Sequence, residues 1–303
     1  MEHVRRLAEP TLRNPVVLFA FTGWNDAGDA ASASVRALVE RWDATPVAEI
    51  DPEPFTDFAT IRPHVRINEG RRSIVWPTVG VWSASVPGGD VLLVLGPEPS
   101  LRWKLFCRQL VGLAEESGAR LAVSMGALLA DVPHSRPVHI IGTANDPDLI
   151  DRYDLQRSRY EGPTGIVGVL LDAMATAGIP TASLWAAVPQ YAAQIPSPKA
   201  ALALVERACR LIGSPAPVDV FANGAAEYDA RVAALIADDD DLVEYVSRLE
   251  SLIDDEVDEP TGEIEVEDSI DPTTLDPDEL VAEVEQLLRD RDPNDEFARL
   301  SVL

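Results

Sequence analysis

Short runs of apolar residues recur along the first two thirds of the chain, and many of these residues are β-branched. Several runs are continuous rather than alternating, which is typical of parallel strands that are covered on both faces. They predict seven strands, at residues Val16–Phe21, Val47–Ile50, Ser73–Trp76, Val91–Leu95, Leu121–Ser124, Val138–Gly142 and Ala182–Val188.

Helical patterns lie between these strands. Apolar residues three and four positions apart, with capping residues, Ser-Pro starts and glycine stops, predict helices at Ala27–Arg41, Ser100–Glu116, Thr164–Thr176 and Ser197–Leu211. Strands that alternate with helices predict a layered α/β fold with a mostly parallel central sheet.

Strand patterns end near residue 215. The segments Ala225–Ile236 and Leu242–Asp254 have amphipathic helical patterns, Val257–Thr274 has the acidic, Pro-containing composition of a linker, and a further helix is predicted behind Asp276. We therefore expect an α/β core domain at residues 1–214 and an acidic helical extension at residues 215–303. Because the helices carry apolar stripes, we expect the extension to cover part of the core and to control access to it.

The charge of the chain is concentrated in this extension. The formal net charge is −26, and residues 223–303 hold 27 acidic and 5 basic residues, which leaves a net charge of −4 for residues 1–222. An acidic segment repels phosphate groups rather than neutralising them, so we expect no nucleic-acid partner.

The remaining composition is that of a soluble protein. The apolar fraction is 46%, and no apolar run approaches the ~20 residues of a membrane span. The first ten residues lack the pattern of a signal peptide, and two cysteines cannot form a disulfide framework. We expect a cytoplasmic protein with no membrane partner, in which Cys107 and Cys209 are buried small hydrophobic residues.

The loop after the first predicted strand is a candidate ligand site. In open α/β sheets, ligands bind where strands end and helices begin. Residues 22–29 lack the glycine spacing of a phosphate-binding or dinucleotide-binding loop, and Asn25, Asp26 and Asp29 suit a hydroxyl group or a cation. The alternative is that Asn25 and Asp26 only cap the helix while the glycines allow the turn.

A second candidate loop precedes the helix at Thr164–Thr176. The backbone amides of Gly162, Thr164 and Gly165 have the small-residue context of an anion site, and we expect them opposite Asp26 and Asp29. The alternative is that these small residues permit close packing of helix and sheet.

No residues with the spacing of a catalytic centre stand out. The four histidines lack metal-ligand spacing, no GxSxG motif occurs, and neither cysteine has a recognisable partner. We therefore predict no catalytic residues, no metal and no cofactor.

Three motifs, in this order, resemble the proteasome assembly chaperone 2 family, and more narrowly its actinobacterial members: FTGWNDAGDAAS, YEGPTGIVGVLLDAM and VPQYAAQIPSPKAALALVERAC. The resemblance covers about residues 14–213. It implies a three-layer α/β/α core like those of nucleoside phosphorylases and hydrolases, a homo-oligomer for which a trimer is expected, and an association with proteasome subunits.

Two features depart from the family pattern. Archaeal relatives dock through a C-terminal hydrophobic-Tyr-X tail, whereas this sequence ends in Arg299–Leu303, and the acidic extension lies outside the common core. Gly28-Asp29 resembles the Gly-Asp turn of phosphorylases, but no arginine pair accompanies it. The resulting hypothesis is a chaperone-like interaction protein. The alternative is an enzyme of nucleoside phosphorylase, hydrolase or carboxylate–amine ligase type.

Tryptophan residues are candidates for subunit contacts. Trp76, Trp82, Trp103 and Trp185 belong to a surplus of apolar and aromatic residues, and aromatic side chains are enriched at protein interfaces. The alternative is that all four belong to the core.

Overall fold

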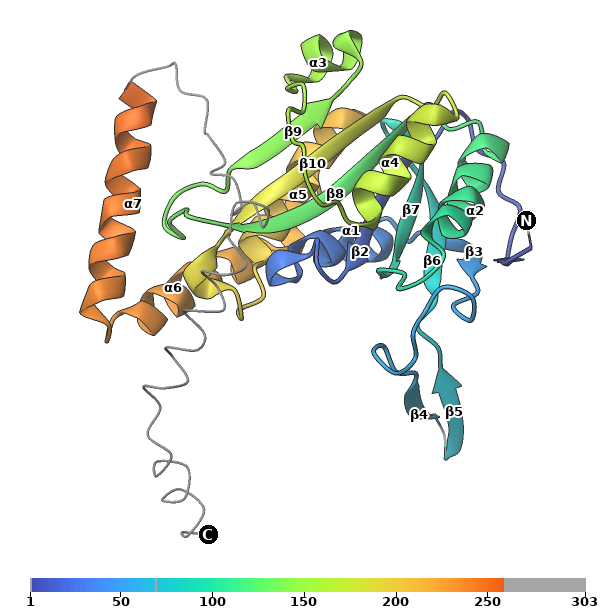
Figure 1. The fold of residues 1–303 in the computed structure, drawn as a ribbon, viewed down its shortest axis with the longest axis horizontal. Coiled ribbons are helices and arrows are strands. Elements are labelled where there is room, and N and C mark those ends of the chain that lie inside the picture. The colour runs from blue at the N-terminus through green and yellow to red at the C-terminus, as the bar shows by residue number, and fades with distance from the viewer. Residues whose placement is uncertain (1, 69, 259–303) are drawn as a thin grey trace, which may run out of the picture. The chain divides into compact units, whose positions relative to one another are not determined.

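The computed structural model describes residues 2–68 and 70–258 (Figure 1). All contacts discussed below lie within Met1–Asp254, which forms one compact unit. Within the described residues, the central sheet has eight strands in the order β1 (Val4–Arg6), β3 (Thr45–Ile50), β6 (Val79–Val86), β7 (Gly89–Pro97), β2 (Val16–Thr22), β8 (Leu121–Ala130), β10 (Thr181–Pro189) and β9 (Ile140–Ala144).

The parallel pairings lie at the centre of this sheet. Strands β7, β2, β8 and β10 are parallel neighbours, and antiparallel strands complete the sheet on both sides. From these pairings and those of β1, β3 and β6, five of the eight strands run in one direction. The mostly parallel central sheet predicted from the apolar runs is therefore confirmed.

Helices cover both faces of the sheet (Figure 1). Strand β2 shows why, because its residues alternate between two hydrophobic clusters: Val16, Leu18 and Ala20 face one cluster, and Val17, Phe19 and Phe21 face the other. Helices α1 (Ala30–Arg41) and α5 (Pro198–Ile212) supply the first cluster, and α2 (Trp103–Glu116) and α4 (Ile166–Thr176) supply the second. The predicted three-layer α/β/α architecture is confirmed.

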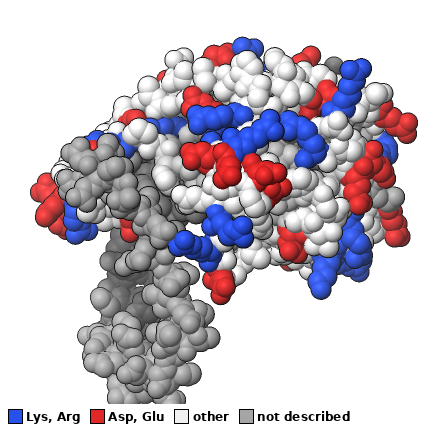
Figure 2. Space-filling model, turned by 90° about the horizontal axis from the view of Figure 1, so that it is seen from above, with Lys and Arg blue, Asp and Glu red and all other residues white. Residues whose placement is uncertain are grey.

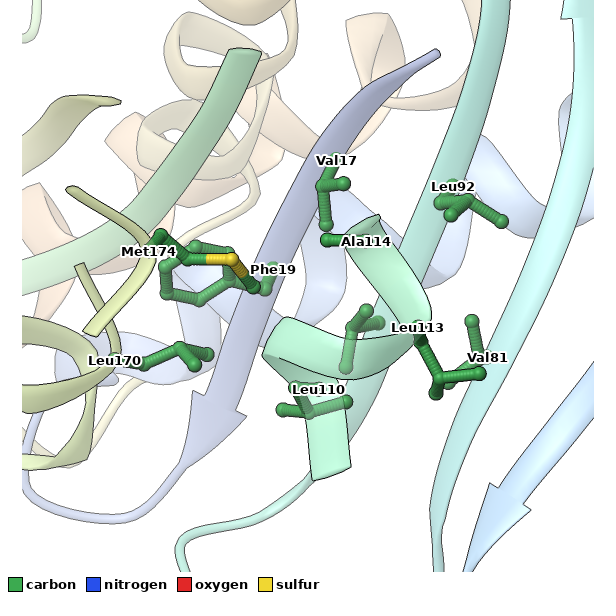
Figure 3. A pocket seen from close by; sticks show the side chains of 10 residues that line it. Val17, Phe19, Val81, Leu92, Leu110, Leu113, Ala114, Leu170 and Met174 are labelled. Carbon is green, nitrogen blue, oxygen red and sulfur yellow. The ribbon is translucent and has the colours of Figure 1, made fainter. Parts of the chain in front are cut away.

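The core beneath α2 and α4 is closely packed. Figure 3 shows a cavity of about 10 Å³ there, bounded by apolar side chains that include Phe19, Leu113 and Met174. A cavity of this size holds at most one water molecule and is lined by no polar partner for it, so this part of the molecule has no room for a ligand.

Several elements differ from the sequence prediction, and β1 is one that was not predicted. The segment predicted as a strand at Ser73–Trp76 is β5 (Arg71–Val75), which pairs with β4 (His64–Asn68) in a separate two-stranded sheet. The side chains of both strands are exposed, so a β-branched run here marks a hairpin rather than a core strand. Helix α3 (Pro147–Tyr153) and strand β6 were not predicted.

The start of α2 also differs from the prediction. The helix begins at Trp103 rather than Ser100, because Arg102 has the left-handed backbone conformation, with φ of 52°. In contrast, the start and stop signals of α5 are confirmed: the Ser197 hydroxyl accepts a hydrogen bond from the Ala200 amide, and Gly213 ends the helix with φ of 81°.

Beyond α5 the described chain continues as a short helical turn, η3 (Val218–Val220), followed by α6 (Ala222–Ile236) and α7 (Asp240–Asp258). Tyr228 and Val232 of α6 are buried against Ala192 and Ile195. The predicted helix behind Asp276 lies outside the described residues, as does the predicted linker from residue 259 onward.

Helix α7 contacts the loop between β8 and β9 through polar side chains. The Tyr245 hydroxyl donates to Asp131 at 2.7 Å, and the Arg136 guanidinium donates to both carboxylate oxygens of Asp254 at 2.9 and 2.7 Å. The predicted division at residues 214 and 215 stays a prediction, although α6 and the described part of α7 both contact the core.

Positive and negative side chains are mixed on the surface. On the face shown in Figure 2, Lys and Arg side chains lie next to Asp and Glu side chains. This mixture agrees with the net charge of −4 for residues 1–222.

None of the helices in the described part of the chain is long and apolar enough to cross a membrane.

Candidate functional site

The loop after β2 lies at the edge of the sheet where the parallel strands end. Gly23 begins it with a φ of 127°, and the turn η1 (Ala27–Asp29) leads into α1 with Gly28 and Asp29 both in the left-handed region. The Ala127 amide of β8 donates to the Asn25 carbonyl at 3.0 Å, and the Ser197 amide donates to the Gly28 carbonyl at 2.7 Å. These bonds hold the loop against β8 and the start of α5.

Asp26 is the buried carboxyl of this loop. One oxygen, Oδ1, accepts a hydrogen bond at 2.9 Å from the Ser32 amide in the first turn of α1. The other oxygen, Oδ2, is buried and has no hydrogen-bond partner among the described residues. Burial raises the pKa of the Asp26 carboxyl above its usual range, although the hydrogen bonds from Ser32 oppose the shift. Asp26 therefore binds an amide in the first turn of α1, which is part of the alternative interpretation, although Asn25 does not bind that turn and the N-cap residue is Asp29.

Asn25 lies at a junction between three loops. Its amide nitrogen donates to the Phe21 carbonyl at 3.1 Å, while its Oδ1 is buried without a partner in the described structure. A Cβ atom added to Gly165 would lie only 2.6 Å from this Oδ1. Only glycine allows this close approach, so Gly165 meets Asn25 rather than Asp26.

The N-terminus of α4 already has an anionic partner within the chain. The Ile166 amide donates to the Glu98 carboxylate at 2.9 Å, and Glu98 follows the last residue of β7. A carboxylate near a helix N-terminus is stabilised by the helix dipole. A side chain of the protein thus lies next to the position at which the sequence predicted a bound anion.

Gly162 and Thr164 lie further out. Both are exposed, and neither lines the groove that contains Asp26. The segment is closed on itself by a hydrogen bond from the Tyr160 hydroxyl to the Pro163 carbonyl at 2.8 Å. The structure therefore brings Asn25 together with Gly165, and Asp26 together with Asp29, but does not place Gly162 or Thr164 beside the two carboxyls.

Asp26 and Asp29 line a groove of about 640 Å³. Its walls come from the loop after β2, the end of β8, strand β10 and the segment before α5, and its lining residues are Gly23, Trp24, Asp26, Ala27, Gly28, Asp29, Ala127, Leu128, Leu129, Trp185, Ala193, Gln194, Ile195 and Pro196. The volume lies within the range of small-molecule sites.

Two tryptophans of the groove were not predicted as site residues. Trp24 is 68% exposed, which is unusual for an indole in a loop. Trp185 is held by a hydrogen bond from its Nε1 to the Ser183 hydroxyl at 2.8 Å, and Gly126 leaves room for its ring. The position of Trp24 within the candidate loop is the signal from which the sequence could have identified it. Trp185 becomes a site residue only through the pairing of β10 with β8.

A buried histidine lies near the groove but is already partnered. His134 Nδ1 is 3.0 Å from the Tyr191 hydroxyl, and the His134 amide donates to the same hydroxyl at 2.7 Å. Burial lowers the pKa of His134 and raises that of Tyr191 to about 12, so both groups are neutral near pH 7. This pair joins the loop after β8 to the turn after β10.

The cysteines are not activated nucleophiles. Cys107 and Cys209 are buried, and burial raises their pKa values to about 11 and about 12, so both are thiols near neutral pH. The prediction that they are buried small hydrophobic residues is confirmed. Within residues 2–68 and 70–258, no group of three or more His, Cys, Asp or Glu residues is arranged to hold a metal ion.

Comparison with solved structures gives two relatives of high similarity. A PAC2 family protein from Streptomyces avermitilis is 45% identical, with a TM-score of 0.71, and the match covers 77% of this chain and 99% of that one. The proteasome-assembly chaperone homologue Rv2125 of Mycobacterium tuberculosis is 40% identical, with a TM-score of 0.70, and covers 76% and 99% of the two chains.

A more distant structure shares the fold. PbaB of Pyrococcus furiosus, described as an archaeal proteasome activator, is 16% identical, with a TM-score of 0.64 over 78% of this chain and 99% of that one. None of the curated proteins compared with this chain matches it. The model of the PAC2 family matches residues 20–236, which is most of the chain and includes all three motifs identified in the sequence. The chain therefore belongs to the PAC2 family, and the resemblance to its actinobacterial members is confirmed.

Proposed function

We propose that this chain is a chaperone-like interaction protein that binds proteasome subunits during their assembly. The observation that carries the proposal is the 40% identity to a protein described as a proteasome-assembly chaperone homologue, over nearly the full length of that protein. Membership of the PAC2 family supports the same assignment. We further propose that the protein acts in the cytoplasm.

The test uses purified chain and the proteasome α and β subunits of the same organism. We expect a complex that co-elutes in size-exclusion chromatography and a faster appearance of assembled, peptide-hydrolysing particles. An unrelated protein of similar size and net charge is the control for non-specific electrostatic binding. If neither a complex nor a change in assembly rate is found, the proposal is wrong.

We also propose that the chain forms a homo-oligomer, with a trimer as the expected state. Of the four tryptophans predicted at subunit contacts, Trp76 is 47% exposed, and it follows strand β5, whose apolar residue Ile74 is exposed as well. Light scattering at tens of micromolar should give three times the 32.8 kDa mass of the chain. A mass of one chain at that concentration contradicts the proposal.

An enzyme of nucleoside phosphorylase, hydrolase or carboxylate–amine ligase type is the second candidate. The observation that favours it is a buried carboxyl, Asp26, in a groove large enough for a small substrate. A thermal-shift screen with nucleosides, nucleotides and inorganic phosphate tests it, because a ligand at 100 times its Kd stabilises the folded state by about 2.7 kcal/mol. A specific shift that is lost in Asp29→Asn supports the enzyme, and the absence of any shift removes it.

A further inference from the structure

We propose that the groove beside α1 binds a small organic cation, with its ammonium group at Asp26 and Asp29 and its apolar part against Trp24 and Trp185. This proposal does not depend on the proposed function, since it concerns a ligand of this chain alone. The sequence led us to expect a ligand with a hydroxyl group or a cation, and the proposal selects one of these classes, an organic cation.

The first observation is the negative charge of the groove. Among the 14 residues that line it there are two carboxyl groups and no Lys, Arg or His. The two carboxyls belong to the same turn, close enough for the charge of Asp29 to influence the pKa of Asp26. A groove with this lining attracts positive charge and repels carboxylate and phosphate groups.

The second observation is the unpartnered oxygen of Asp26. The side chain is 6% exposed, its Oδ1 is engaged by the Ser32 amide, and its Oδ2 has no partner in the described structure, although the residue lines the groove. Buried polar atoms in folded proteins almost always have a partner. A positive charge held in the groove beside this carboxyl stabilises its ionised form and so offsets the cost of the unpartnered oxygen.

The third observation is that the walls of the groove are apolar. Such walls favour an organic cation over a bare metal ion. Trp24 and Trp185 offer indole rings, and Leu129, Ile195 and Pro196 add aliphatic surface. Indoles attract ammonium groups through their π faces, and they bury the hydrocarbon part of a ligand. A hard cation such as Ca²⁺ needs six to eight oxygen ligands, whereas the oxygen-bearing side chains of this lining are two carboxyl groups and the amide of Gln194.

The experiment compares ligands of one size that differ in charge. Binding of hexylammonium, hexanol and hexanoate to the full chain is measured by isothermal titration calorimetry, with CaCl₂ as a further ligand. We expect hexylammonium to bind at least tenfold more tightly than hexanol, and hexanoate to show no binding. Asp26→Asn and Asp29→Asn should each weaken hexylammonium binding at least fivefold, and Trp24→Ala should weaken both hexylammonium and hexanol.

Two control variants change matched residues outside the groove. Asp151→Asn removes an exposed carboxyl on α3, and Leu101→Ala removes an exposed apolar side chain just before α2; both should leave binding unchanged. Equal binding of hexylammonium and hexanol, tighter binding of hexanoate, or binding of Ca²⁺ in place of hexylammonium each overturns the proposal. The proposal is also overturned if Asp29→Asn binds hexylammonium as tightly as the wild type does. This variant tests the proposal even if Asp26→Asn fails to fold.

Discussion

At the scale of single residues, the loop after β2 combines capping with an unusual burial of polar atoms. Asp26 serves α1 through one oxygen and leaves the other without a partner, and Asn25 leaves its Oδ1 in the same state. Unpaired buried polar groups lower the free energy of unfolding, so two of them at adjacent positions support the ligand site that we propose for this loop.

The buried Asp26 carboxyl should make stability depend on pH. Its pKa is raised in the folded state, so the folded protein binds a proton more tightly than the unfolded chain does, and stability is lost as pH rises through the folded-state pKa. We expect the unfolding free energy of Asp26→Asn to rise relative to that of the wild type as pH increases above the ordinary pKa of Asp, about 3.9.

Urea denaturation at a series of pH values measures this difference. Asp151→Asn, which changes an exposed carboxyl, is the control and should follow the wild type. Asp26→Ala removes the hydrogen bond to Ser32 as well and should cost about 0.5–2 kcal/mol at low pH. This cost should fall as pH rises, because the variant also lacks the titrating carboxyl. A difference between Asp26→Asn and the wild type that is constant with pH contradicts the assignment.

Gly165 should tolerate no side chain. The Cβ of Gly165→Ala would lie 2.6 Å from Asn25 Oδ1 and 3.1 Å from Glu98 Oε1, and both atoms belong to packed loops. We expect a loss of about 1–3 kcal/mol in unfolding free energy, measured by chemical denaturation. Gly162→Ala is the matched control, because its added Cβ meets only the exposed side chain of Tyr160, so at most the exposed hydrogen bond from Tyr160 to Pro163 is disturbed. Equal stability of the two variants would show that the loops adjust freely.

At the scale of secondary-structure elements, α6 and α7 contact the core in different ways. Helix α6 buries Tyr228 and Val232 against the core. The described part of α7 buries Val246 and Leu249 and adds polar contacts from Tyr245 and Asp254. Polar contacts at the surface contribute little net free energy, so burial of the apolar side chains supplies most of the stabilisation of both helices.

Removing Arg136 should loosen the end of α7 near Asp254 without unfolding the protein, because Arg136 donates to both carboxylate oxygens of that residue. The guanidinium of Arg136 lowers the pKa of Asp254, which means that the contact stabilises the docked helix above the ordinary pKa of Asp and is lost as pH falls through the lowered value. We expect Arg136→Ala to speed hydrogen exchange of the α7 amides while leaving exchange in β2 and β8 unchanged.

A matched arginine on the neighbouring helix serves as the control. Arg231→Ala changes an exposed residue of α6 and should leave exchange in α7 as it is in the wild type. If exchange in α7 is the same in Arg136→Ala and the wild type, other contacts hold the helix.

At the scale of the whole molecule, the groove and the C-terminal helices are neighbours. Ile195 lines the groove and also packs against α6 through Tyr228 and Val232. One residue therefore belongs both to the candidate ligand site and to the contact between core and extension.

Truncation after Ser214 should test the expected division of the chain. It removes α6 and exposes the apolar surface of Ala192 and Ile195, so we expect a lower thermal midpoint and increased binding of a hydrophobic dye. Truncation after residue 258, which keeps α6 and α7, is the control. A truncated core of unchanged midpoint would mean that the extension is an independent tail.

Much of the fold follows from local pattern. The continuous apolar run of Val16–Phe21 gave a central strand, and the Ser-Pro start and glycine stop gave α5, because these signals act within a few residues of chain. The hairpin of β4 and β5 shows the limit, since a β-branched run specifies an extended conformation but not the partner strand or the burial of its side chains.

The sequence by itself determined the family, the layered fold and the loop that carries Asn25, Asp26 and Asp29, since motif, periodicity and position after a strand are all local. Only the tertiary structure decided which side chains surround that loop. The pairing of β10 with β8 places Trp185 in the groove, and the position of residues 193–196 beside the loop places Ile195 there. At the start of α4, the Glu98 carboxylate takes the place of an external anion. These contacts join residues more than fifty positions apart, and the physical reason is that burial and hydrogen bonding in the folded chain, not local spacing, select them.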